Sequence, residues 1–208
     1  MQSIVGTVIS LEKVRYMNTH VITMLRPDMP SLLAGRLDGK RALARNLESL
    51  PNITSPTVVV LDFKGVELAT SSFLDEAVVR CRDHLRLGRS PAYLMTANLN
   101  GRVEEELHDL LARTGDALVT CTLSTSGQIS DKKLLGALEP KLSETLQLVN
   151  TKGEATAIEL HSEADDSAAK IGATAWNNRL SSLAAKSLVV EVPQPGRTKK
   201  FRSMMEAV

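Results

Sequence analysis

The stretch Val58–Val79, VVVLDFKGVELATSSFLDEAVV, decides the fold of this chain. Its first four residues are all apolar and mostly β-branched, a pattern that predicts a short buried strand. A turn is predicted next by Asp62, Lys64 and Gly65. Between Leu74 and Leu85 apolar residues then recur every three or four positions, which predicts an amphipathic helix. A strand followed so closely by a helix indicates a sheet with helices packed on it.

Paired serines precede the predicted helix. Ser72 is followed three residues later by Asp75. This is the spacing of a capping box, in which each of the two side chains bonds a backbone amide at the helix start. We therefore expect a helix over residues 72–86 with Ser72 as its N-terminal cap.

The alternation of strands and helices continues on both sides of this stretch. Further strands are predicted at Ser3–Leu11, Thr19–Leu25, Ala92–Ala97 and Ala117–Leu123, and further helices after Pro30 and after Gly101. This order predicts a mixed sheet with helices, an α/β or α+β fold. The polar stretch Ser124–Lys133 contains a glycine and predicts a linker. We therefore expect a first domain at residues 1–125, a linker at 126–138 and a second domain at 139–208.

The segment Asp62–Glu76, DFKGVELATSSFLDE, resembles the core of STAS-like domains, which are relatives of anti-sigma-factor antagonists. It is most similar to a divergent bacterial branch with an SFLDE-type signature. The upstream segment Gly35–Leu50, GRLDGKRALARNLESL, resembles the first helix of that branch. The resemblance covers roughly the first 125 residues and implies a domain that docks a protein partner.

The STAS-like resemblance also implies a regulatory site. In antagonists of this family a serine or threonine at a helix start is phosphorylated by a GHKL-type kinase. Ser71 is the matching position, and Ser72 lies beside it. The sequence departs from the family pattern, since Thr70 replaces an aspartate and Phe73 and Asp75 replace glycines. The alternative is that these serines only cap the helix, a role in which serine is common.

Residues 134–204 show a different pattern, with three predicted helices followed by a β-hairpin. The helices are expected at Leu134–Val149, at a short segment capped by Thr156 with Glu159 three residues on, and at Thr174–Lys186, and the hairpin strands at Ser187–Val192 and Lys200–Met204. The segments ATAIELHSEA and TAWNNRLSSLAAKSLVVEV resemble the winged helix-turn-helix module of bacterial transcription regulators, over roughly residues 139–204. The stretch Asp165–Gly172 is longer than the usual turn of that module. Either the second helix continues through it or the turn carries an insertion.

The winged-helix resemblance implies a surface that contacts DNA. The candidate contacts are Trp176, Asn177, Asn178, Arg179, Arg197, Lys199, Lys200 and Arg202. Asparagine pairs with adenine and arginine with guanine, and basic residues of a hairpin suit phosphates. Trp176 also lies on the apolar face of its helix, which favours a place in the core. Residues 139–208 contain nine Lys or Arg and nine Asp or Glu, so protein contact or dimerisation is the alternative use of this module.

The sequence shows no catalytic or metal-binding pattern. Its four histidines are scattered, and its two cysteines, Cys81 and Cys121, have no spacing typical of metal ligands. We therefore expect no enzyme activity, no cofactor and no metal, and two buried cysteines in a reducing compartment. No apolar run approaches the roughly 20 residues that cross a membrane, and the N-terminus lacks the pattern of a secretion signal. These features predict a cytoplasmic protein.

Together these patterns predict a non-enzymatic regulator. In the first interpretation the winged helix binds double-stranded DNA as a homodimer, while the STAS-like domain docks a protein partner. The family resemblance implies that this partner is a GHKL-type ATPase or kinase. In the alternative interpretation the chain is an adaptor subunit of a larger bacterial assembly, and the winged helix mediates protein contacts.

Overall fold

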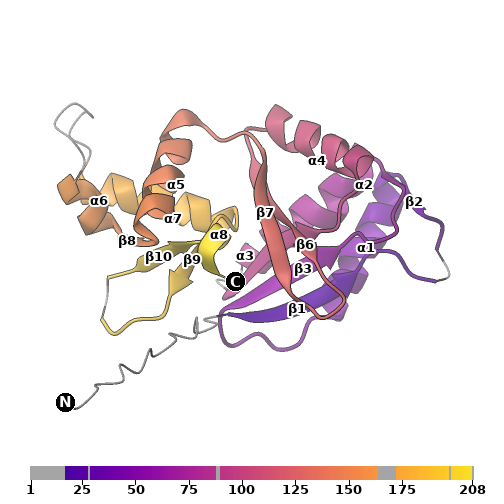
Figure 1. The fold of residues 1–208 in the computed structure, drawn as a ribbon, viewed down its shortest axis with the longest axis horizontal. Coiled ribbons are helices and arrows are strands. Elements are labelled where there is room, and N and C mark those ends of the chain that lie inside the picture. The colour runs from indigo at the N-terminus through magenta and orange to yellow at the C-terminus, as the bar shows by residue number, and fades with distance from the viewer. Residues whose placement is uncertain (1–16, 28, 88–89, 164–171, 197, 208) are drawn as a thin grey trace, which may run out of the picture.

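The computed structural model describes residues 17–27, 29–87, 90–163, 172–196 and 198–207 (Figure 1). Their largest sheet has five strands in the order β1-β3-β5-β6-β7. These strands are β1 (Asn18–Thr23), β3 (Thr57–Asp62), β5 (Ala92–Ala97), β6 (Ala117–Leu123) and β7 (Ile129–Gly136). The first four run parallel, and β7 returns antiparallel to β6. The chain is therefore a mixed α/β protein, as its sequence predicts.

The helices that connect the parallel strands cover one face of this sheet. They are α1 (Arg36–Glu48), α2 (Ser71–Leu74), the π-helical turn η1 (Asp75–Val79), α3 (Arg80–Leu87) and α4 (Gly101–Arg113). The short strands β2 (Leu32–Leu33) and β4 (Leu68–Ala69) pair beside them. Because β1, β3, β5 and β6 follow one another across the sheet in chain order, right-handed crossovers place the helices between them on the same side. Val59, Leu61 and Leu94 belong to the core on this side.

Gly39 sets how closely α1 approaches the segment that carries the two serines. A Cβ atom at this position would lie 2.9 Å from the carbonyl oxygen of Phe73 and 2.9 Å from Cβ of Glu76. Glycine alone leaves room for this approach. Arg36, in the first turn of α1, adds an ion pair to Glu76 at 2.8 Å. The start of α2 and η1 are therefore held tightly against α1.

The C-terminal residues form helices and a second, three-stranded antiparallel sheet in the order β8-β10-β9. The elements are α5 (Pro140–Lys152), β8 (Glu154–Thr156), α6 (Ala157–Glu163), α7 (Ala173–Ala185), β9 (Val189–Val192), β10 (Lys200–Ser203) and α8 (Met204–Ala207). The expected cap of the short helix is confirmed. The Thr156 N–H donates to Glu159 Oε2 at 2.7 Å, and the Glu159 N–H donates to Thr156 Oγ1 at 3.2 Å.

These C-terminal elements cover the second face of the five-stranded sheet. From the sheet, one apolar cluster contains Val60, Met95 and Val119, and from the C-terminal elements it contains Leu180 and Val189. Parallel strands are usually buried on both faces, and all six residues of β5 are buried here. The two halves of the chain therefore share one core, and Figure 1 shows α7, β9 and α8 next to the sheet.

The segment 126–138, which was predicted as a linker, instead contains strand β7, which pairs with β6 at the edge of the five-stranded sheet. β7 is an edge strand, and of its residues Leu135 alone is buried. An edge strand can carry mostly polar side chains, so its sequence resembles that of a linker. The following helix was expected from Leu134 but begins at Pro140, since Leu134 belongs to β7 and proline suits a first helical turn.

Two predicted segments lie outside the described residues. They are the strand Ser3–Leu11 and residues 165–171 of the long turn between α6 and α7. None of the helices in the described part of the chain combines the length and apolar character needed to cross a membrane.

Candidate functional site

The paired serines at the start of α2 bond to two different neighbours. Ser71 Oγ donates to Glu106 Oε2 of α4 at 2.5 Å. Ser72 Oγ lies 3.3 Å from Thr70 Oγ1, which also accepts the Gly35 N–H at 3.1 Å. The start of α2 therefore connects α4 with the loop that leads into α1.

The predicted capping box at Ser72 is wrong. α2 begins at Ser71 with Thr70 at the N-cap position, and no side chain caps it. Both serine hydroxyls bond other side chains instead. A phosphate on Ser71 would replace the hydroxyl that donates to Glu106 and would place two negative groups side by side. The geometry can thus convert an added charge into a displacement of α2 from α4.

The predicted recognition helix, α7, buries its tryptophan and holds an arginine beside it. Trp176 is 1% exposed, which confirms its expected place in the core and removes it from any outward-facing contact surface. The guanidinium of Arg179 lies 4.9 Å from the centre of the Trp176 ring and 3.9 Å from the carboxylate of Glu144 in α5. Its side chain is only 16% exposed. Arg179 therefore packs α7 against α5 and does not extend into solvent.

The outer face of α7 is polar and uncharged. Its exposed residues are Thr174, Asn178, Ser181, Ser182 and Ala185. Of the two predicted asparagine contacts, Asn178 belongs to this face and Asn177 is half-buried. The predicted contact Arg197 lies outside the described residues.

The basic residues of the β9–β10 hairpin are paired with carboxylates. Lys199 Nζ lies 2.8 Å from the carboxylate of Glu191, and Lys200 Nζ lies 2.8 Å from that of Glu154. Arg202 also bonds Glu154. The hydrogen bond from Lys200 is the main reason why the pKa of Glu154 is below its ordinary value, and Arg202 lowers it further. The hairpin therefore carries positive side chains whose charge is largely neutralised within the module.

A buried carboxylate joins the two halves of the chain. Asp116, just before β6, accepts hydrogen bonds from Arg82 of α3 and from Lys186 at the end of α7, each at 2.7 Å. The Asp116 side chain is 10% exposed and that of Arg82 is 5% exposed. Burial raises the pKa of Asp116, but the hydrogen bonds and charges of Arg82 and Lys186 outweigh burial and hold the pKa below its ordinary value. Asp116 is therefore ionised at neutral pH and ties α3 to α7.

The turn between α7 and β9 fits against the sheet where two strands separate. β5 pairs with β6 through Thr96–Ala97, at its carboxyl end. Earlier in β5, the Leu94 N–H donates to Ser187 Oγ at 3.1 Å. Ser187 is buried and has a φ of 59°. Tyr93 OH accepts the Glu191 N–H at 2.9 Å. These bonds fix the position of the C-terminal module on the sheet.

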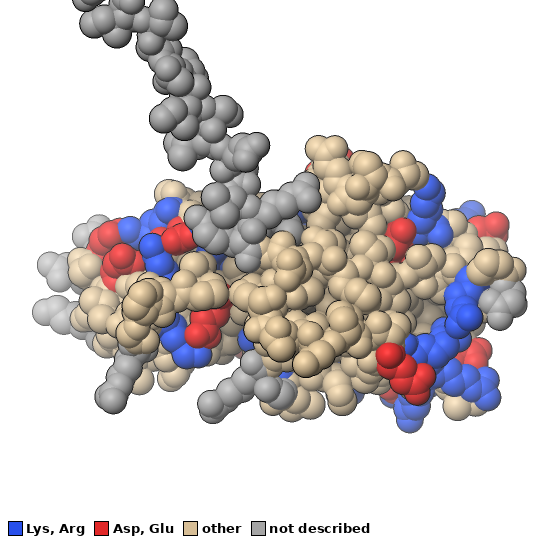
Figure 2. Space-filling view, turned by 90° about the horizontal axis from the view of Figure 1, so that it is seen from below, with Lys and Arg blue, Asp and Glu red and all other residues tan. Residues whose placement is uncertain are grey.

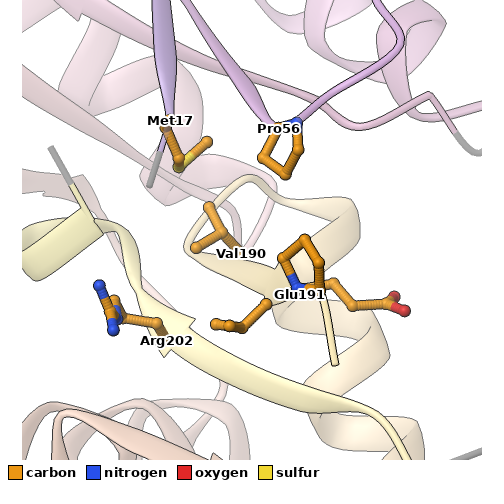
Figure 3. Close-up of a pocket in the computed structure, with 7 residues that line it drawn as sticks. Met17, Pro56, Val190, Glu191 and Arg202 are labelled. Carbon is orange, nitrogen blue, oxygen red and sulfur yellow. The ribbon is translucent and has the colours of Figure 1, made fainter. Parts of the chain in front are cut away.

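A small apolar hollow lies at the edge of this junction. Met17 and Pro56 line it from the side of the sheet, and Val190 and Arg202 line it from β9 and β10 (Figure 3). Its open volume is about 10 Å³, close to that of a single water molecule. It is therefore a packing defect and no site for a cofactor. Sequence reasoning missed the whole junction, because its contacts join residues far apart in the chain that belong to no motif.

The His, Cys, Asp and Glu side chains form no metal-binding cluster in the described part of the chain. No three His, Cys, Asp or Glu side chains gather there in a way that would hold a metal ion. Cys81 and Cys121 are buried and free. Burial raises the pKa of the Cys81 thiol to about 12 and that of the Cys121 thiol to about 11, so both stay protonated and are poor nucleophiles and ligands.

A family model described as a STAS-like domain of unknown function (DUF4325) matches residues 39–83. The matched segment runs from α1 through β3 and the paired serines into α3. No solved structure matches the chain. A STAS-like domain indicates a regulatory or binding role for this part of the protein.

Proposed function

We propose that the chain is a non-enzymatic transcription regulator. Its STAS-like part docks a protein partner, and residues 139–208 form a winged helix-turn-helix module that binds double-stranded DNA. The element order α5-β8-α6-α7-β9-β10, three helices ending in an antiparallel hairpin, supports this assignment. In a helix-turn-helix the second helix of the motif enters the major groove, and in this proposal α7 is that helix.

The observation that carries DNA binding is the outer face of α7. It is exposed and holds short polar side chains, among them Asn178, and no charged residue. Such a face can approach base edges closely, and an asparagine amide can bond an adenine in two places.

The hairpin supplies the phosphate contacts in this proposal. The ion pairs of Lys199 and Lys200 are partly exposed to solvent. Exposed pairs contribute only about 0–1 kcal/mol, so DNA phosphates can replace the carboxylates as partners. A winged helix that reads two half-sites requires a homodimer, and the role requires a cytoplasmic protein.

The same ion pairs favour a second candidate function. With Arg179 packed against Trp176 and the hairpin cations held by Glu154 and Glu191, the module presents little free positive charge. Dedicated DNA-binding domains are usually more basic. In this candidate function the chain is an adaptor subunit of a larger bacterial assembly, and α7 contacts another protein.

We further propose that the partner of the STAS-like part is a GHKL-type ATPase or kinase. Phosphorylation of Ser71 would then release its bond to Glu106 and alter the docking surface around α2. The helix-cap alternative predicts that Ser71 affects stability alone.

Fluorescence anisotropy tests the DNA-binding function. The full chain is titrated against the duplex from its own upstream region and against a scrambled duplex, at two salt concentrations. We expect tighter binding to the upstream duplex that survives the higher salt. Asn178→Ala should weaken that binding by about tenfold or more. Gln147→Ala, on the exposed side of α5, is the matched control. Binding to neither duplex would refute DNA recognition and leave the adaptor function.

A further inference from the structure

A hollow opens between β2 and α1, on the side of the STAS-like part away from the C-terminal module. Apolar residues form most of its lining, namely Met29, Pro30, Leu32, Leu33, Ala34 and Phe73. Asp38, Arg41 and Arg45 from α1 complete it. Its open volume is about 220 Å³, below the roughly 300–1,000 Å³ of sites that enclose a cofactor or metabolite. The hollow has room for one large apolar side chain.

The rim of the hollow carries basic side chains, two of which have no ion-pair partner in the described part of the chain. Arg45 lines the hollow and forms no ion pair with any described residue, and the exposed Lys40 on the same helix also forms none within that part of the chain. Arg41 pairs with Asp38 at 3.0 Å, but their side chains are 66% and 57% exposed, so solvent weakens the pair. Figure 2 shows Lys and Arg side chains gathered with fewer acids at the end of the molecule that carries β2 and α1, while the middle of that face is mostly uncharged.

Exposed leucines lie beside these cations. Leu32 is 48% exposed and Leu37, in the first turn of α1, is 63% exposed. An apolar centre within a rim rich in arginine is typical of protein-binding surfaces. A single strand of nucleic acid would instead need an exposed aromatic ring on which to stack a base. Phe73, the aromatic residue of the hollow, is 1% exposed and offers no such platform.

We propose that this hollow binds an acidic segment of a protein partner. One apolar side chain of the segment occupies the hollow, and its flanking carboxylates pair with Arg45, Arg41 and Lys40. The inference rests on the proposed docking function and names its surface. The hollow also contacts Phe73 in α2, two residues from Ser71, so an occupant would touch the helix whose start carries the paired serines.

The first test uses a short synthetic peptide in which glutamates flank a central leucine. Anisotropy with the labelled peptide and the full chain should give saturable binding. Arg45→Glu should raise the Kd by about tenfold or more, since it replaces an attraction with a repulsion. Ala34→Trp, which fills the hollow, should do the same. Lys141→Glu, an equal charge reversal at an exposed position of α5, should leave the Kd unchanged.

Control peptides test whether binding requires both the glutamates and the central leucine or only the overall charge of the peptide. A peptide with lysine in place of glutamate and one with alanine in place of leucine should both lose binding. Amide chemical shifts in the full chain should move for residues of β2 and α1. No saturable binding, equal losses with Arg45→Glu and Lys141→Glu, or shifts confined to α7 would overturn the proposal. So would a change of oligomeric state in place of peptide binding, because the surface would then belong to a second copy of the chain.

A second measurement distinguishes this inference from the proposed function. If a purified GHKL-type ATPase binds wild type and Arg45→Glu equally well, the proposal that the hollow is the docking surface is refuted, and the docking function stands. If neither the ATPase nor the peptide binds the wild-type chain, both are refuted. Circular dichroism melting of each variant confirms that it is folded before its Kd is compared.

Discussion

Asp116→Ala tests the ion-pair network that joins the two halves of the chain. The substitution removes a carboxylate that accepts hydrogen bonds from Arg82, Lys186 and the Ala117 N–H at 2.7, 2.7 and 2.8 Å. Arg82 keeps Asp83 at 2.8 Å, but its Nη1 atom already lacks a hydrogen-bond partner in the described structure. A nearly buried guanidinium would therefore lose the partner that lies deepest in the fold.

The expected loss of stability follows from the burial of the Asp116–Arg82 ion pair. Removing one partner of a buried ion pair costs about 3–5 kcal/mol. Lys186 is 23% exposed and can turn toward water, so we expect the lower end of that range, about 3 kcal/mol. Asp83→Ala is the matched control, because it removes the other carboxylate of the same arginine. The Asp83 side chain is 43% exposed, so its loss should cost about 1 kcal/mol or less.

Because the pKa of Asp116 is lowered, its contribution to the unfolding free energy depends on pH, and the direction of this dependence can be predicted. A carboxyl group whose pKa falls on folding stabilises the protein above its unfolded pKa of about 3.9, and the contribution is lost as the pH falls through the folded value. The difference in unfolding free energy between wild type and Asp116→Ala should therefore be full at neutral pH. This difference should begin to decrease as the pH falls below about 4.

Urea unfolding followed by tryptophan fluorescence and by far-ultraviolet circular dichroism measures both effects. Trp176 is the only tryptophan and reports on the C-terminal half, while circular dichroism reports on the whole chain. The two signals should change together, because the halves share one core. A loss no larger than that of Asp83→Ala, or a difference that persists in full at about pH 3, would refute the reasoning.

Three further substitutions test the other sites. Ser71→Asp places a carboxylate against Glu106 and should lower the melting temperature and change the affinity for the partner; wild-type affinity in a pull-down would contradict the switch. Glu154→Gln removes the ion-pair partner of Lys200 in the hairpin and should steepen the salt dependence of DNA binding in anisotropy; an unchanged slope would count against hairpin contacts. Gly39→Ala sets a methyl group 2.9 Å from a backbone oxygen of α2 and should cost about 1–3 kcal/mol in urea unfolding. Gly101→Ala, with open space around it, is the control and should cost nothing.

The parts of the fold that local pattern determines are found where the sequence predicts them. Strands β5 and β6 have the predicted bounds, and β3 extends the predicted apolar run by one residue at each end. The capping pair Thr156 and Glu159 and the buried position of Trp176 are also confirmed. Each of these features depends on residues within a few positions of one another, so hydrophobic period and cap chemistry suffice to predict it.

Features that depend on distant neighbours could not be predicted in this way. β7 is a strand because β6 provides its backbone partners, although its own side chains are mostly polar. Ser72 does not cap its helix, because the N-cap position is held by Thr70, two residues earlier, whose hydroxyl instead accepts the distant Gly35 N–H. Arg179 was expected to face DNA, but the Trp176 ring and Glu144 hold it against the module.

By itself, the sequence determined the mixed sheet with helices, the helix that carries the paired serines, and the helical and hairpin character of the C-terminal residues. Only the tertiary structure decided how these parts combine. The strands of the sheet follow one another in chain order, so their helices cover one face and leave the other apolar face open. The C-terminal module covers that second face, with Asp116 and Lys186 bonded across 70 positions of the chain. No local sequence pattern predicts such a contact, because burial of apolar area depends on which surfaces meet and not on their order in the sequence.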